Sequence, residues 1–232
     1  MYYFPNLFRV DDDRLALLRK KVFRDGNIVV WGPGSGISDG EKIGAESATK
    51  LTGFRFTVLP ANAQRRILIS NFDHPVTRGC DESLVIGGPL AYGPVLVPVD
   101  GVELGRAWTK GGMNMVGMSI KEFGSGAAGN GKGSYGDGDY AAIFTTAVQI
   151  PADVWRNIAR YAGAHVYCES NDILLADSSV VALHSLKPGR RTIRLPGKKQ
   201  VRDLIDGRIM SRSTREFSFD LHAPGTRVFL LE

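Results

Sequence analysis

Apolar and polar residues alternate along the chain in short segments of two kinds, and the chain opens with a helical segment between two extended ones. In residues 11–26 the apolar side chains recur at the spacing of an amphipathic helix. These apolar positions are Leu15, Leu18 and Val22. Asp11 to Asp13 can cap this helix and Gly26 can end it. The flanking residues 2–8 and 27–31 are short and largely apolar, which is typical of buried parallel strands, so the pattern predicts a strand, helix and strand in one sheet.

The same pattern predicts more strands and a second helix further along the chain. The additional strand segments are residues 66–70, 83–86, 95–99 and 139–146. Pro151 is suited to the first turn of a helix, which carries Val154 and Ile158 on its apolar side and ends at Gly163. The first 163 residues are therefore predicted to form an α/β domain with a parallel sheet.

From residue 164 the pattern changes to brief runs of β-branched and aromatic residues. Turn-forming sequences separate these runs, at residues 170–172, 187–189, 206–207 and 223–225. This spacing is typical of a small antiparallel module. Residues 164–232 are therefore predicted to form a second, β-sandwich-like unit.

Composition narrows the class of protein. The chain has 232 residues, of which 43% are hydrophobic, enough for one large or two small domains. No apolar run is long enough to span a membrane and no export signal is present, so a cytoplasmic protein without a membrane partner is expected. The two cysteines, Cys80 and Cys168, are too few for a disulfide framework or a structural zinc site. We expect neither a metal nor a cofactor.

The formal net charge of +5 raises the question of a nucleic-acid partner. Basic residues cluster at residues 19–21, 65–66, 190–191 and 198–199. No recognition helix or RNA-binding signature accompanies them, and net charge alone specifies a partner poorly. Solvated faces and turns account for these clusters, and nucleic acid is not expected as a partner.

Several segments, in their order and spacing, resemble family-42 glycoside hydrolases, the β-galactosidases. The whole stretch 154–231 resembles the C-terminal end of that family. The earlier matching segments are residues 2–8, 11–26, 27–31, Leu51-Thr52-Gly53-Phe54 and Asn71-Phe72-Asp73-His74-Pro75-Val76-Thr77-Arg78-Gly79. The resemblance implies a trimerisation domain with a flavodoxin-like fold, similar to class I glutamine amidotransferases, over residues 1–163. It also implies that a first strand and helix of this domain are missing before Tyr2, and that a small β-module follows it.

In that family neither the trimerisation domain nor the terminal module holds the catalytic carboxylates. The barrel with its two catalytic glutamates has no counterpart in this sequence, so the resemblance implies a non-catalytic assembly or accessory domain. The partners it implies are further copies of this chain, as a trimer or dimer, or a glycoside hydrolase catalytic chain. An uncovered sheet edge around Tyr2 to Phe8 would favour such pairing.

A second hypothesis is that the chain is a small serine hydrolase acting on esters. Residues 36–40, Gly-Ile-Ser-Asp-Gly, match the pattern of a nucleophile elbow and follow a predicted strand. Ser38 would be the nucleophile, His74 its base and Asp73 the accompanying acid. The alternative is that residues 36–40 are a polar loop and that Asp73-His74 forms a structural turn before Pro75. From the residues alone, assembly domain and esterase both remain open.

One segment is conspicuously rich in glycine, residues 124–138. It lacks the order of a phosphate-binding loop, and Lys132 does not stand where such a loop places its lysine. We expect a surface loop there, because so much glycine favours the unfolded conformations of the chain. Its role is not specified by the sequence.

Overall fold

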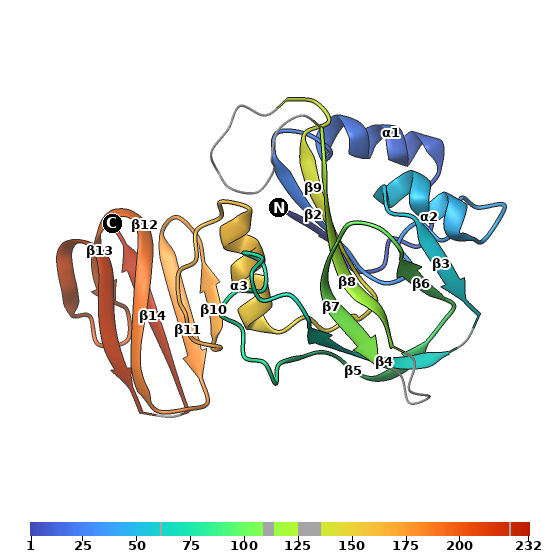
Figure 1. The fold of residues 1–232 in the computed structure, drawn as a ribbon. Helices are drawn as coiled ribbons and strands as arrows, with labels where there is room; N and C mark the ends of the chain where they lie inside the picture. The colour runs from blue at the N-terminus through green and yellow to red at the C-terminus, as the bar shows by residue number, and fades with distance from the viewer. Residues whose placement is uncertain (61, 109–113, 125–135, 223) are drawn as a thin grey trace. The chain divides into compact units, whose positions relative to one another are not determined.

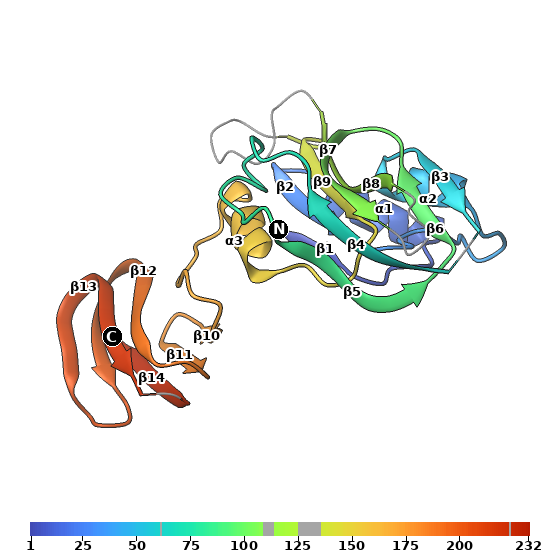
Figure 2. The same cartoon turned by 60° about the horizontal axis from the view of Figure 1, so that its bottom comes forward.

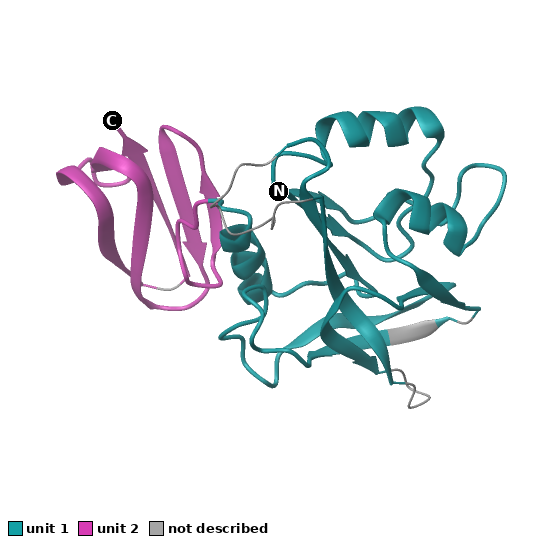
Figure 3. Cartoon of the chain, turned by 45° about the horizontal axis from the view of Figure 1, so that its top comes forward, with its two compact units in different colours: residues 1–164 teal, residues 165–232 magenta. Residues whose placement is uncertain are grey.

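The computed structural model describes residues 1–60, 62–108, 114–124, 136–222 and 224–232, without the side chains of residues 63 and 64. The chain divides into two compact units, Met1–Ala164 and His165–Glu232. Figure 3 draws them in different colours. Each unit has its own hydrophobic core, and each is described by itself.

A seven-stranded sheet with the order β1-β2-β9-β8-β7-β4-β5 forms the centre of unit 1 (Figure 2). The strands are β1 (Tyr2–Phe4), β2 (Asn27–Trp31), β4 (Ala63–Ile69), β5 (Val85–Tyr92), β7 (Val102–Trp108), β8 (Asn114–Phe123) and β9 (Tyr140–Thr145). Only β1, β2 and β9 run parallel to one another, and every other pairing in this sheet is antiparallel. Two further strands, β3 (Phe56–Leu59) and β6 (Val95–Pro98), pair with each other in a small antiparallel sheet.

The prediction of a flavodoxin-like, parallel α/β fold is therefore wrong. Strands make up 48% of the described residues and helices 13%, and the main sheet is a curled, mixed half-barrel. A doubly wound fold needs a crossover helix between each pair of parallel strands. Here the strands after β2 are joined mainly by turns and loops, which produce antiparallel neighbours. Only the opening strand, helix and strand, with β9 beside them, keep the expected parallel arrangement.

Three helices pack on the two faces of the sheet in the described part of unit 1 (Figure 1). They are α1 (Asp12–Lys21), α2 (Ala45–Thr52) and α3 (Ala152–Tyr161). Side chains of β2 alternate between the two faces, so that Val29 and Trp31 join the core under α1 and α2. Ile28 and Val30 belong to the opposite core, which includes residues of α3. The predicted first helix is confirmed, with the Asp11 side chain accepting a hydrogen bond from Arg14 N at 2.9 Å.

Unit 2 is a five-stranded antiparallel sheet with the order β10-β11-β14-β12-β13. Its strands are β10 (Ile173–Ala176), β11 (Val180–Ser185), β12 (Gly189–Asp203), β13 (Ile209–Leu221) and β14 (Gly225–Leu231). The long strand β12 pairs with β13 along most of its length and with β14 near its end. Phe217, Phe219 and Phe229 pack together in the core that one face of this sheet covers.

Candidate functional site

The connection from β2 to α2, residues 32–44, lines a cleft between α1 and α2. The cleft has a volume of about 550 Å³ and carries charged side chains of both signs. They are Asp11, Asp12, Asp39, Glu41, Lys42, Glu46 and Lys50. Lys50 forms an ion pair with Asp12 at 2.5 Å, which joins the two helices across the cleft. The segment in which the sequence predicts a nucleophile therefore lies beside an open, polar cleft.

Ser38 is half-buried, and hydrogen bonds from both its backbone and its side chain hold this segment in place. Its N–H donates to Phe8 O at 3.0 Å, and its carbonyl accepts from Val10 N at 3.0 Å. Its hydroxyl oxygen accepts a hydrogen bond from Gly40 N at 3.1 Å. A nucleophile elbow places its serine on a sharp turn directly between a strand and a helix. Ser38 instead lies in the middle of a long connection, where it forms isolated β-bridges with Arg9 and Ile43.

The side chain of Asp39, the next residue, stabilises a turn of the backbone. Its carboxylate accepts hydrogen bonds from Glu41 N at 2.9 Å and from Lys42 N at 2.8 Å. These hydrogen bonds, first that from Lys42, hold the pKa of Asp39 below its ordinary value. The group is exposed and ionised at neutral pH, so it is unsuited to act as a general acid.

Asp73 and His74 lie in a tight turn after β4. Asn71 Oδ1 accepts hydrogen bonds from Asp73 N at 3.1 Å and His74 N at 3.3 Å. The His74 ring accepts from Val76 N at 3.2 Å through Nδ1, and it packs edge-on against Tyr161 of α3 with 5.4 Å between ring centroids. Burial lowers the pKa of His74. The imidazole therefore serves this turn as a neutral acceptor.

The structure does not bring the three predicted catalytic residues together. The hydrogen bonds of Ser38 go to residues 8, 10 and 40, and those of His74 go to residues 71, 76, 77 and 78. In the part of the chain that the structure describes, no hydrogen bond joins Ser38 to His74 or Asp73. The geometry gives the esterase hypothesis no support. The glycine-rich segment 124–138 lies largely outside the described residues.

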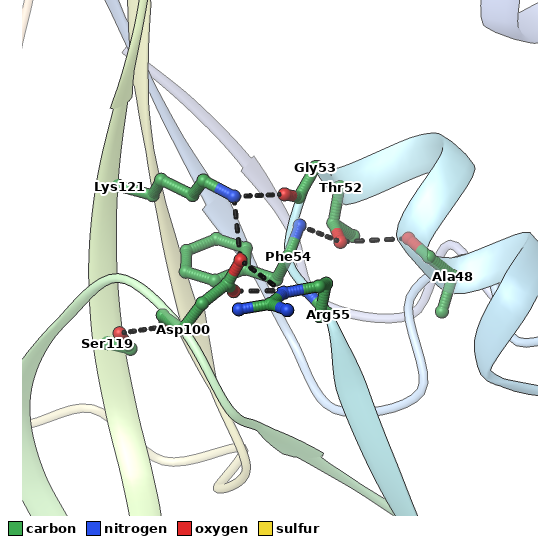
Figure 4. Close-up of polar contacts among 8 residues, drawn as sticks. All are labelled: Ala48, Thr52, Gly53, Phe54, Arg55, Asp100, Ser119 and Lys121. Atoms are coloured by element: carbon green, nitrogen blue, oxygen red, sulfur yellow. Dashed lines mark hydrogen bonds and ion pairs between the residues drawn. The ribbon is translucent and has the colours of Figure 1, made fainter.

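A polar cluster that sequence reasoning missed joins α2 to the sheet (Figure 4). Asp100 Oδ2 accepts hydrogen bonds from Lys121 Nζ at 2.8 Å and Arg55 Nε at 3.3 Å. Lys121 Nζ also donates to Gly53 O at 2.8 Å, at the end of α2. Burial alone would raise the pKa of Asp100, but the hydrogen bonds from Lys121 and Arg55 outweigh burial and lower it. The cluster fixes the helix that forms one wall of the cleft.

Two kinds of feature are not found among the described residues. No group of three or more histidine, cysteine, aspartate or glutamate side chains is arranged to hold a metal ion. No helix in the described ranges is long and apolar enough to cross a lipid bilayer.

No protein-family model and no curated protein sequence matches this chain. Solved structures of β-galactosidases do match its fold. The enzyme from Bacillus circulans sp. alkalophilus aligns with a TM-score of 0.56 and 13% identity, over 99% of this chain and 32% of the other. The enzyme from the Antarctic haloarchaeon Halorubrum lacusprofundi aligns with a TM-score of 0.54 and 13% identity, over 98% and 30%. A catalytic mutant of Gan42B, a GH42 β-galactosidase from G. stearothermophilus, aligns with a TM-score of 0.52 and 13% identity, over 99% and 31%.

The chain thus spans about a third of the length of the β-galactosidases that it matches. At this level of identity the likeness concerns the fold, which is that of a β-galactosidase-like domain. The resemblance to β-galactosidases is confirmed to that extent. Its finer implication, a likeness to glutamine amidotransferases, stays a prediction.

Proposed function

We propose that this chain is a non-catalytic assembly domain of β-galactosidase type. The observation that carries this proposal is the likeness itself, which extends over nearly all of this chain and over only about a third of each matching β-galactosidase. On this proposal the chain contributes to the association of subunits and carries no hydrolytic site of its own.

The carboxyl groups of the described residues support the non-catalytic part of the proposal. A glycoside hydrolase keeps one carboxylic acid protonated near neutral pH by raising its pKa. In the described ranges, six carboxyl groups have a pKa that is lowered below its ordinary value. These groups are Asp39, Asp81, Asp100, Asp172, Asp177 and Asp206. All six accept hydrogen bonds that stabilise the carboxylate, so none of them is prepared to donate a proton.

The two edges of the seven-stranded sheet support the assembly part. Edge strand β5 contains Pro89, and its pairing with β4 includes a register shift, two features that discourage pairing with another chain. Edge strand β1 contains neither proline nor charge. Tyr2 is 39% exposed and Phe8, just beyond the strand, is 52% exposed. We therefore assign the β1 edge as the surface on which a second copy of this chain docks.

Side-by-side hydrolysis assays test the catalytic half of the proposal. The purified chain is expected to turn over neither a chromogenic galactoside nor a chromogenic ester. Galactoside turnover that survives a second purification and scales with protein concentration would overturn the proposal. Ester turnover that disappears in Ser38→Ala, with the melting temperature unchanged, would instead establish the hydrolase that the sequence left open.

A further inference from the structure

Arg65 is an unusual residue for the interior of a sheet. It stands on β4 with Ile67 and Ile69, and the alternation of the strand directs all three side chains to the buried face. Arg65 is 1% exposed, and its neighbour Arg66 is exposed on the opposite face. Arginine is rarely buried to this degree without a partner of opposite charge.

The guanidinium of Arg65 is only partly satisfied by the protein. Its Nη2 donates to the carbonyl oxygen of Tyr92 at 2.6 Å, and the group lies 3.8 Å from the centroid of the Tyr92 ring. Its Nε and Nη1 are buried and have no hydrogen-bond partner. None of the ion pairs among the described residues includes Arg65. Burial lowers the pKa of Arg65, but a guanidinium remains protonated inside proteins, so a positive charge stays in this site.

A small cavity adjoins this charge. Its volume is about 10 Å³. Besides Arg65, its walls are Gly88, Leu90, Tyr92, Ala147, Val148 and Gln149. Space of this size is enough for one water molecule or one monatomic ion. The Tyr92 hydroxyl donates to Thr146 O at 2.7 Å, which fixes the ring that bounds the cavity.

The positive charge of Arg65 indicates whether a water molecule or an ion occupies the cavity. A buried cation without an anionic partner is strongly unfavourable, by several kcal/mol in general. One water molecule can accept a hydrogen bond from the guanidinium, but it leaves the charge uncompensated. We propose that this cavity is a binding site for a monatomic anion of the halide class, chloride under ordinary conditions, held by the Nε and Nη1 groups of Arg65. The site is independent of the assembly function proposed above.

Thermal unfolding of the whole chain tests this proposal. Sodium chloride replaces sodium gluconate at constant ionic strength, because gluconate is too large for the cavity. The Tm is expected to rise with chloride by a few degrees for each tenfold increase above the Kd, as binding to the folded state requires. Arg65→Met should abolish this rise. Arg66→Met, at the exposed neighbouring position, should retain it.

A second measurement uses only the wild-type chain and so does not depend on the folding of a variant. Line broadening of the chloride nuclear magnetic resonance signal by the wild-type chain should disappear when bromide is added as a competitor. A Tm that does not depend on chloride, with no line broadening, would overturn the proposal and leave a water molecule as the occupant. An equal chloride dependence in Arg65→Met would also overturn it, because binding would then occur elsewhere.

Discussion

Two fully buried charges, one in each unit, are handled in opposite ways. Asp203 of unit 2 is 0% exposed, and its Oδ1 accepts a hydrogen bond from Ile205 N at 2.8 Å. Its Oδ2 forms an ion pair with Arg227, which binds the end of β12 to β14. Arg65 of unit 1 is equally buried and has no carboxylate partner among the described residues. The comparison teaches that a buried charge with an ionic partner, such as Asp203, joins two segments of the fold. A buried charge without such a partner, such as Arg65, is stabilised by binding an ion of opposite charge.

The other charged clusters follow the pattern of Asp203. Asp100 joins the end of α2 to β8, and Asp172 joins the segment before β10 to Arg191 of β12. These three carboxylates are thus each engaged in holding two segments of the fold together.

The largest loss of stability is expected when the buried carboxylate of Asp203 is removed. Asp203→Ala leaves Arg227 partly buried with only the more exposed Asp206 as a partner, at 3.0 Å. We expect unit 2 to lose about 3 to 5 kcal/mol of unfolding free energy, measured by urea denaturation. The matched control is Asp220→Ala on β13, whose ion pair with Arg190 is exposed and 3.8 Å long. Similar losses in the two variants would show that the burial of Asp203 has no energetic consequence.

The second largest loss of stability is expected at low pH, where Asp172 becomes protonated. Burial alone would raise the pKa of Asp172, but hydrogen bonds from Arg191, Ser170 and Ser185 lower it to about 2. In the unfolded chain the group titrates near 3.8, so its contribution is present above about pH 4 and is lost as the pH falls toward 2. The expected loss is about 2 kcal/mol, measured as the pH dependence of the urea midpoint. Asp172→Asn should flatten this dependence, and an unchanged slope would count against the ion pair.

A smaller effect is expected from Asp100, which is less completely enclosed. Asp100→Asn keeps the shape of the side chain and removes its charge, which weakens the hydrogen bonds from Lys121 and Arg55. We expect unit 1 to lose about 1 kcal/mol of unfolding free energy. Asp73→Asn, at an exposed position in the turn after β4, is the control and should be neutral. A neutral Asp100→Asn would mean that the cluster in Figure 4 does not hold α2.

The smallest effect is expected at Ser38. Its hydroxyl accepts one hydrogen bond, from Gly40 N, in a loop at the surface. Ser38→Ala should change the unfolding free energy by less than about 0.5 kcal/mol, because solvent can replace that contact. Differential scanning calorimetry checks this value. A large loss would give the residue a structural role that its contacts do not indicate.

Local patterns in the sequence predicted the elements well where a single periodicity dominates. The helix that begins after Asp11, the strands β2 and β9, and the helix that follows Pro151 all form as the spacing of apolar residues indicates. The direction of the strands was not predictable in the same way. A run such as residues 66–70 reads alike in a parallel and an antiparallel sheet, and strand pairing depends on contacts distant in the sequence. The parallel fold, predicted from the short apolar strands around the first helix and from the resemblance, was therefore wrong.

The polar clusters were missed for a related reason. Arg65 shares a face with Ile67 and Ile69 in β4, whereas Lys121 lies on the face of β8 opposite to Met118 and Ile120. A charged residue that falls on the apolar face of a strand is the signal that would have identified Arg65, and no such signal marks Lys121. The partners of these residues, at positions 53, 92 and 100, come from other segments, so only the folded chain reveals them. The serine motif in residues 36–40 gave the opposite error, a predicted site for which the geometry gives no support. A match over five residues does not specify which side chains lie nearby in the folded chain.

The molar mass of the purified chain in solution tests the central claim, that this is an assembly domain, most directly. Light scattering after size-exclusion chromatography should give three times the 25.2 kDa of one chain, the trimer that the resemblance implies. Tyr2→Lys should dissociate it by placing a charge on the β1 edge, whereas Leu186→Lys, at an exposed position in unit 2, should not. A mass of two chains would replace the trimer with two-fold edge pairing. A monodisperse wild-type monomer would contradict the claim.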